Sequence, residues 1–248
     1  KQGYDITFIN TCFENRKMSY YEHCRYRNFE GVAIVCADYN DPDVLELMNS
    51  DLPVVTIDYV HHNCTAVSSN NIQGMEDLVK YIYQQGHRKI AYIHGQENSY
   101  VTKDRLASFY RTMDELGLEV PDEYIRTADY LETKEAARQT REILNLPDVP
   151  TCIIYPDDTA LIGGRNVIIE MGLRIPRDIS VAGYDGTRIS QLLHPKLTTI
   201  RQNTELIGSE AAKRLIGTIE KPRTTLVERV VIEGSLVPGQ SVGKILQK

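Results

Sequence analysis

Residues 151–186 read TCIIYPDDTALIGGRNVIIEMGLRIPRDISVAGYDG, and this stretch decides the fold. It holds two short apolar runs, Thr151–Tyr155 and Ile179–Ala182, each followed by a proline or glycine, which is typical of buried parallel strands. Between the runs, apolar residues recur at helical spacing, and Gly172 supplies a helix stop. The stretch therefore predicts a strand, a helix and a second parallel strand.

Acidic residues follow the carboxyl ends of both predicted strands, at Asp157 and Asp185. In an open parallel sheet this edge is where ligands bind, because strand ends and helix N-termini present unpaired backbone groups there. Each residue also has a structural alternative, since Asp157 can cap the following helix and Asp185 can form a turn between Gly183 and Gly186. We expect a small-molecule site at this edge.

The rest of the chain alternates predicted strands and helices, which is typical of doubly wound α/β structure. The other predicted strands are Tyr4–Asn10, Gly31–Cys36, Leu52–Asp58, Lys89–His94, Tyr124–Thr127 and Arg229–Leu236. The other predicted helices are Asn15–Asn28, Val44–Met48, Met75–Gln85, Thr102–Glu115, Lys134–Leu144 and Leu206–Ile219. No low-complexity linker divides the chain, so two lobes joined by short crossovers are expected.

Composition excludes several classes of protein. The 248 residues carry a formal net charge of −6, which argues against a nucleic-acid-binding surface on this chain. No apolar run approaches the ~18 residues of a membrane span and no signal segment opens the chain, so a soluble cytoplasmic protein is expected. The five cysteines are scattered and odd in number, which favours reduced thiols.

Six motifs occur in one order along the chain. They are GHRKIAYI at 86–93, RLASF at 105–109, DDTAL at 157–161, MGLRIP at 171–176, DISVAGYD at 178–185 and PKLTTI at 195–200. Together they resemble the effector-binding domain of the LacI/GalR family of bacterial transcription regulators. The resemblance implies the periplasmic-binding-protein type I fold: α/β, with two doubly wound parallel-sheet lobes joined by three crossovers, near Gly95, near Gln202 and before Arg229.

On this resemblance the first lobe comprises residues 1–95 and 203–226, and the second comprises residues 96–202 and 227–248. Family members have a further strand and helix before Tyr4, and a helix-turn-helix headpiece, and we expect this chain to lack both. Loss of a central strand exposes two sheet edges. The slot between Tyr4–Asn10 and Gly31–Cys36 is therefore expected to be empty, disordered or filled by a neighbour.

The resemblance implies effector contacts for Arg105, Tyr130 and Gln202, in addition to Asp185 at the edge of the sheet. Arg105 takes the place of the family's effector arginine, whose guanidinium fork holds hydroxyls or a carboxylate, although spacing alone favours a solvated surface arginine. Tyr130 stands where members offer an aromatic platform to a sugar, with a core or surface role as its alternative. Gln202 matches a polar contact in some members and is otherwise a hinge residue.

Three further features modify this interpretation. Asp58 ends a first-lobe strand and is expected to face the cleft from that side, or else to be a solvated loop residue. Pro156 replaces the asparagine that usually precedes Asp157 in the family, which removes a polar contact. Ser68 and Thr204 stand where some sugar-binding members place rings. These departures argue against a plain monosaccharide.

Metal, cofactor and catalytic sites are not predicted. The cluster His61-His62-Asn63-Cys64 places ligands at adjacent positions, where they point apart, so no metal is expected. Ser190 and His194 lack the Gly-x-Ser-x-Gly setting of a nucleophile, and the glycines at 163–164 lie inside a helix and form no phosphate loop. We expect neither an enzyme nor a cofactor.

The sequence therefore predicts the sensor half of a LacI/GalR-like regulator. It would bind a small polar effector, a sugar or sugar derivative, between its lobes. It would form a homodimer and reach operator DNA through a separate headpiece. The alternative within the same fold is a solute-binding protein of a sugar transporter, which the cysteines and the absent export signal disfavour. A sugar-modifying enzyme is the alternative from another class, and it lacks a poised nucleophile or carboxylate pair.

Overall fold

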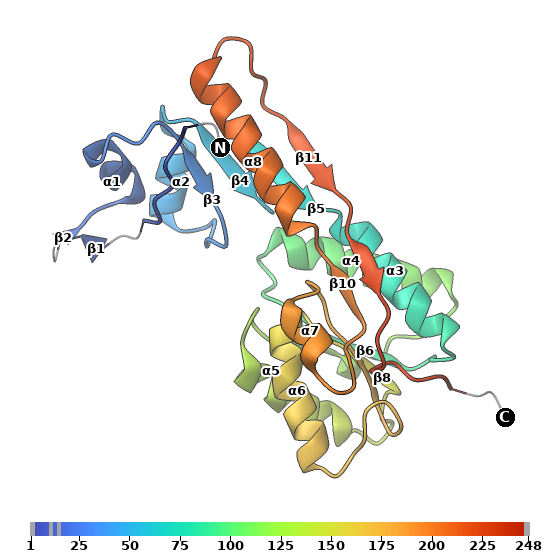
Figure 1. The fold of residues 1–248 in the computed structure, drawn as a ribbon. Helices are drawn as coiled ribbons and strands as arrows, with labels where there is room; N and C mark the ends of the chain where they lie inside the picture. The colour runs from blue at the N-terminus through green and yellow to red at the C-terminus, as the bar shows by residue number, and fades with distance from the viewer. Residues whose placement is uncertain (1–2, 10–11, 14–15, 246–248) are drawn as a thin grey trace. The chain divides into compact units, whose positions relative to one another are not determined.

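The computed structural model describes residues 3–9, 12–13 and 16–245 of the chain (Figure 1). The chain forms two compact units. The first unit comprises Lys1–Ser68 and Thr204–Ile232, and the second comprises Ser69–Asn203 and Glu233–Lys248. The chain therefore passes between the units three times, as predicted for this fold. No described helix is long and apolar enough to cross a membrane.

The sheet of the first unit has the strand order β11-β5-β4-β3 within the described residues. Strands β3 (Val32–Ile34), β4 (Val54–Ile57) and β5 (Thr65–Ser69) run parallel, and β11 (Arg229–Ile232) follows β5 at the edge. Successive residues of β4 enter different clusters, since Val54 packs with Leu47 and Met48 whereas Val55 packs with Ile207 and Ala211. This alternation is the period of a strand buried on both faces.

In the first unit, two short strands and helix α1 precede β3, and helices α2 and α8 follow it. Hairpin strands β1 (Cys12–Phe13) and β2 (Arg16–Lys17) are antiparallel. Helix α1 (Tyr20–Tyr26) begins later than Asn15, the predicted start, because Ser19 and Glu22 form a reciprocal capping box. Helix α2 (Pro42–Met48) is capped by Asp41. Helix α8 (Thr204–Glu220) packs against β4.

The predicted strand at the start of the chain does not form. Residues 4–9 belong to no strand of the described sheets, and the side chains of Ile6 and Phe8 are 86% and 96% exposed; Asn10 lies outside the described residues. A strand is stabilised by its partner, and the edge of β3 opposite β4 pairs with no other strand among the described residues.

The sheet of the second unit has the order β7-β6-β8-β9, and all of its strands run parallel. The strands are β6 (Ile90–His94), β7 (Ile125–Thr127), β8 (Cys152–Ile154) and β9 (Ser180–Ala182). Helices α3 (Asn71–Gln84) and α4 (Tyr100–Glu115) cover one face, and α5 (Thr133–Leu144) and α6 (Asp158–Glu170) cover the other. These elements agree with the predicted alternation.

Shorter elements complete the second unit. A short 3₁₀ helix, η1 (Asp122–Tyr124), precedes β7, and helix α7 (Arg188–Leu192) follows β9. Strands β10 (Thr199–Arg201) and β12 (Ser235–Val237) form an antiparallel pair next to α3. The chain thus returns from the first unit after Ile232 and pairs β12 with β10 in the second unit.

The unit boundaries differ from the predicted ones in two places. Residues 69–95 belong to the second unit, because β6 lies inside its sheet between β7 and β8. The predicted strand Arg229–Leu236 is divided, because β11 joins the sheet of the first unit and only β12 belongs to the second. Strand β5 was not predicted, since its sequence TAVSS is short and half polar. The first crossing of the chain therefore lies next to Ser69 and not near Gly95.

Candidate functional site

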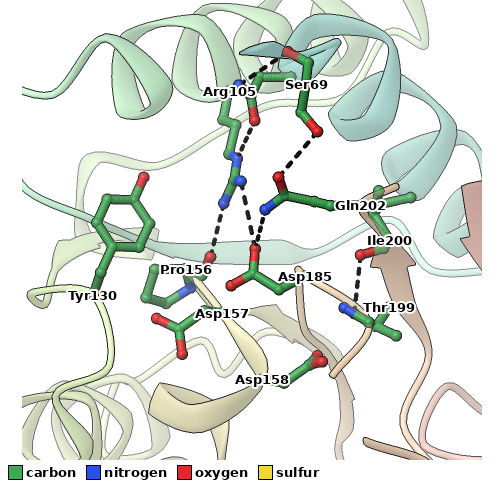
Figure 2. A network of polar contacts seen from close by, with 12 residues as sticks. Ser69, Arg105, Tyr130, Pro156, Asp157, Asp158, Asp185, Thr199, Ile200 and Gln202 are labelled. Atoms are coloured by element: carbon green, nitrogen blue, oxygen red, sulfur yellow. Dashed lines mark hydrogen bonds and ion pairs between the residues drawn. The ribbon is translucent and has the colours of Figure 1, made fainter. Parts of the chain in front are cut away.

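The candidate site lies at the carboxyl ends of the strands in the second unit (Figure 2). Pro156 and Asp157 follow β8, Asp185 follows β9, and Arg105 comes from the second turn of α4. This is the edge that the sequence predicted. It brings together five of the six predicted site residues within one unit: Arg105, Tyr130, Asp157, Asp185 and Gln202.

Arg105 is buried, with 2% of its surface exposed. Its Nε donates to Asn71 Oδ1 at 2.9 Å, and its Nη1 donates to the carbonyl oxygen of Pro156 at 2.9 Å. Its Nη2 lies 3.7 Å from Asp185 Oδ1. Pro156 lacks the amide side chain of the asparagine expected at this position, but its backbone carbonyl oxygen contributes to the site by accepting from Arg105. The surface alternative for Arg105 is excluded in this structure.

Tyrosine rings surround the guanidinium group of Arg105. The guanidinium carbon lies 3.5 Å from the centre of the Tyr184 ring and 5.8 Å from that of Tyr130. Burial by itself would lower the pKa of Arg105, but Tyr184, Tyr130 and Asp185 raise it above its ordinary value. Arg105 therefore remains a cation despite its burial, since its pKa stays far above neutral.

Tyr130 is fixed from two sides. Its hydroxyl lies 2.8 Å from Thr102 Oγ1 in α4. Its ring lies against Gly95, where a Cβ atom would stand 2.2 Å from the Tyr130 Cε2. Burial raises the pKa of Tyr130, so the hydroxyl is neutral near pH 7. The ring is thus a rigid, uncharged surface beside the cation, as a platform for a ligand requires.

Asp185 adopts a left-handed backbone conformation with φ of 91°, which turns the chain after β9. Gln202 Nε2 donates to Asp185 Oδ1 at 2.5 Å, and Ser69 Oγ donates to Gln202 Oε1 at 3.0 Å. Among the described residues, Asp185 Oδ2 accepts no hydrogen bond, and 28% of the side chain is exposed. Burial raises the pKa of Asp185, while Arg105 and Gln202 act in the opposite direction. One oxygen of Asp185 is therefore held and the other is open.

Asp157 and Gln202 have structural roles here. Asp157 Oδ1 accepts from the backbone amides of Thr159 and Ala160, both at 2.8 Å, and its Oδ2 accepts from the amide of Leu131 at 2.8 Å. Both oxygens of Asp157 are thus occupied, as expected of a helix cap. The amide group of Gln202 is likewise used at both ends. Gln202 orients Asp185, and contact of Asp157 or Gln202 with a ligand stays a prediction.

Asp58 belongs to the first unit, unlike the other predicted residues. It follows β4 in a left-handed conformation with φ of 58°, and its amide donates to the carbonyl oxygen of Val67 at 3.0 Å. Its role in binding stays a prediction. Nearby, His61 Nδ1 and Cys64 Sγ are 3.9 Å apart. No group of three or more potential metal ligands occurs among the described residues.

Sequence reasoning missed two residues that build the site. Asn71 holds Arg105 and, through its Nδ2, the carbonyl oxygen of Ser69. Tyr184 lies beneath the guanidinium, and its position two residues after Ala182 on the same side of the strand was a signal that could have identified it. The sequence contains these residues, but it does not show which side chains they contact in the folded protein.

Asp158 supports the loop that carries Asp185. It is fully buried, and its Oδ2 accepts from the amide of Thr187 at 2.7 Å and from the hydroxyl of Thr187 at 3.0 Å. A Cβ atom at Gly183 would lie 2.3 Å from Asp158 Oδ1, so the chain must have glycine there. Burial raises the pKa of Asp158 to about 6, against the effect of Thr199 and Thr187.

Comparison with known proteins agrees with this architecture. The chain matches the periplasmic binding protein-like domain over residues 79–242. It is 29% identical over 224 residues to the HTH-type transcriptional repressor PurR of Aliivibrio salmonicida, covering 89% of this chain and 67% of that protein.

Solved structures of transcriptional regulators also resemble the chain. A putative LacI transcriptional regulator from Bacillus cereus subsp. cytotoxis superposes with a TM-score of 0.84 at 25% identity, covering 91% of this chain and 80% of the other. The transcriptional regulator CelR in complex with cellobiose gives a TM-score of 0.77 at 26% identity, covering 90% and 71%. These relatives are regulators and not enzymes. The chain therefore belongs to the periplasmic binding protein-like domain family and is an effector-binding domain of the LacI-family type.

Proposed function

We propose that the group formed by Arg105, Asp185 and Tyr130 binds a small polar effector, and that its occupancy controls operator binding by the regulator. The observation that carries this proposal is the state of Asp185. One oxygen is fixed by Gln202 while the other is open, next to a buried cation stacked on a tyrosine ring. A site built only for stability would pair both oxygens, as Asp157 does.

The chemistry of these groups favours a sugar or sugar derivative. The open oxygen of Asp185 accepts a hydrogen bond, and the guanidinium of Arg105 donates. A hydroxyl group both donates and accepts, so neighbouring hydroxyls on one ring satisfy both groups. The ring of Tyr130 offers an apolar surface to the ring face. The cellobiose complex of the similar regulator CelR supports this class of ligand.

A regulator is favoured over the alternative, a transporter's solute-binding protein. The similar proteins are repressors and transcriptional regulators. With a net charge of −6, this chain is expected to act on DNA through a separate headpiece. Operator half-sites are paired, so a homodimer is expected, and light scattering at micromolar concentration should report twice the mass of the chain. A cytoplasmic location is part of the same proposal.

The test is ligand binding with matched variants. Ribose, glucose, cellobiose, adenosine and guanosine would be screened by thermal shift, and the best ligand measured by calorimetry. Asp185→Asn should weaken its affinity by about tenfold to a hundredfold, because a charged hydrogen bond contributes about 1.5–3 kcal/mol. Asp114→Asn, at an exposed position in the same helix as Arg105, is the control. Equal affinity in both variants would place the ligand elsewhere.

A further inference from the structure

Leu131 adopts a backbone conformation that its side chain disfavours. Its φ is 64°, in the left-handed region where a Cβ atom crowds the backbone. Leu131 is the third residue of a turn between β7 and α5, which a hydrogen bond from the Glu132 amide to the Asp129 carbonyl oxygen closes at 3.2 Å. Turns with a left-handed third residue usually have glycine or asparagine there. The leucine therefore strains this turn.

The side chain of Leu131 does not compensate for this strain. It is 65% exposed, so it gains little from burial. Strained residues persist where their surroundings hold them, and they are concentrated at functional sites. The second residue of the turn is Tyr130, whose ring centre lies 5.8 Å from the guanidinium carbon of Arg105 (Figure 2). The strained turn thus carries one of the three proposed effector-binding groups.

Asp157 holds this turn from the end of β8. Its Oδ2 accepts a hydrogen bond from the Leu131 amide at 2.8 Å, and the residue is 1% exposed. A hydrogen bond to a carboxylate is roughly twice as strong as one between neutral groups. The bond fixes the backbone of the strained residue itself, and it connects positions 26 residues apart in the sequence.

Helix capping does not require this second oxygen. Asp157 Oδ1 by itself accepts from the amides of Thr159 and Ala160 in the first turn of α6, both at 2.8 Å. Serine and asparagine cap helices about as well as aspartate does, with one oxygen. Capping therefore accounts for one oxygen of Asp157, and the turn of Leu131 accounts for the other.

The residues on either side of Asp157 hold the other two groups of the site. The carbonyl oxygen of Pro156 accepts from Arg105 at 2.9 Å. The amide of Asp158 donates to the carbonyl oxygen of the residue before Asp185, also at 2.9 Å. One short segment is therefore bonded to the arginine, to the turn of the tyrosine and to the loop of the open carboxylate.

We propose that Asp157 is a positioning residue for effector binding, which holds the Leu131 amide and thereby keeps the Tyr130 ring in place beside Arg105. This inference rests on the proposed function. It differs from a direct contact between Asp157 and the effector, since the carboxylate acts through the turn. Asp157 then matters for affinity only while the ring is present and the residue after it resists the left-handed conformation.

The first test needs no effector. In Asp157→Asn, Oδ1 can still cap α6, but an NH2 group replaces the oxygen that accepts from the Leu131 amide. Hydrogen exchange at that amide, followed by NMR, should be about tenfold faster than in the native sequence. Equal exchange rates would overturn the inference, because the turn would not depend on Asp157.

Affinity is then measured by calorimetry with the best binder among ribose, glucose, cellobiose, adenosine and guanosine. Asp157→Asn should weaken it by about threefold to tenfold, because the ring is no longer held. Adding Leu131→Asn should restore most of this loss, since asparagine adopts the left-handed conformation more readily. Tyr124→Phe is the control: its hydroxyl donates to the Asp148 carbonyl oxygen at 3.0 Å, so the melting temperature should fall and the affinity stay unchanged.

A variant without the ring distinguishes positioning from direct contact. In a Tyr130→Ala background, Asp157→Asn should change the affinity by less than about twofold. A loss as large as in the native sequence would overturn the inference, because Asp157 would then contact the bound compound itself. Failure of Leu131→Asn to restore the affinity of Asp157→Asn would overturn it as well, since strain in the turn would not be the cause.

Asp185→Asn separates this inference from the proposed function. If Asp185→Asn weakens binding and Asp157→Asn does not, the role of Asp157 is wrong and the proposed site stands. If neither variant changes the affinity, or none of the five compounds binds, the proposed function fails and the role of Asp157 fails with it.

Discussion

The guanidinium carbon of Arg105 lies 3.5 Å above the centre of the Tyr184 ring. Cation–π contacts of this kind contribute about 2 kcal/mol when they are shielded from water. Two hydrogen bonds, to Asn71 and to the carbonyl oxygen of Pro156, fix the orientation of the guanidinium group within its own plane. The arginine is therefore preorganised before any ligand arrives, and its removal affects the free protein as well as the complex.

Arg105→Ala should lower both stability and affinity. It leaves the oxygens of Asn71 and Pro156 without their donor and opens a cavity above Tyr184, so the free energy of unfolding should fall by about 2–3 kcal/mol. Arg111→Ala is the control, because that side chain is half exposed on the same helix and its ion pairs with Glu76 and Glu115 contribute little. Chemical denaturation measures both variants. Equal stability of the two would contradict the packing around Arg105.

Gln202→Ala should weaken ligand binding only through Asp185. The amide of Gln202 is bonded to Ser69 and Asp185, so its loss releases the Asp185 carboxylate from its orientation. Calorimetry on a double-mutant cycle tests this. In the Asp185→Asn background, Gln202→Ala should change the binding free energy by less than about 0.5 kcal/mol. Additive effects of the two substitutions would show that Gln202 contacts the ligand itself.

Asp158 should make stability depend on pH in an unusual direction. Its pKa is about 6 in the folded protein and 3.8 ordinarily, so the folded state keeps the proton longer than the unfolded state. The contribution of this group therefore falls as pH rises from about 4 to about 6, by up to about 3 kcal/mol. Denaturation curves across this range should show the slope in the native sequence and lose it in Asp158→Asn. An unchanged slope in the variant would assign the effect to other groups.

Gly95→Ala and Gly208→Ala should have opposite effects on stability. A Cβ atom at position 95 would overlap the Tyr130 ring, displace it and break its contact with Thr102, so both melting temperature and ligand affinity should fall. Gly208 lies exposed in α8 with nothing within 4 Å of a Cβ atom, so alanine should stabilise that helix by about 0.5–1 kcal/mol. Thermal melts decide the sign in each case.

The fold of the second unit could be predicted because its signals are local. Strands β6, β8 and β9 are short, buried runs followed by a glycine or proline, and helices α3, α4 and α6 are followed by a glycine, as in the segment from Thr151 to Gly186. The strands of the first unit could not all be predicted, because some of them are defined by pairing with segments that are distant in the sequence. Strand β5 is recognisable only beside β4, and residues 4–9 read as a strand but have no partner among the described residues.

The site was predictable in its charges but not in its geometry. Family resemblance identified Arg105, and the position of Asp185 after a predicted strand identified that residue; the structure places Arg105 Nη2 3.7 Å from Asp185 Oδ1. The sequence could not show that Arg105 is buried, because a charged helix such as α4 is usually solvated. It also could not distinguish Asp157, whose oxygens are both bonded to backbone amides, from an open carboxylate. Hydrogen-bond occupancy is a property of the folded chain.

The bond between Arg105 Nε and Asn71 Oδ1 has a consequence for divergence among related sequences. Because Arg105 is buried, its Nε–H group needs a hydrogen-bond acceptor within the protein. As long as position 105 is arginine, position 71 is therefore restricted to residues whose side chain carries an acceptor. A change at either position alone leaves an unpaired group, and the two positions are therefore expected to change together. In an alignment, covariation between 71 and 105 would mark lineages in which the effector itself has changed.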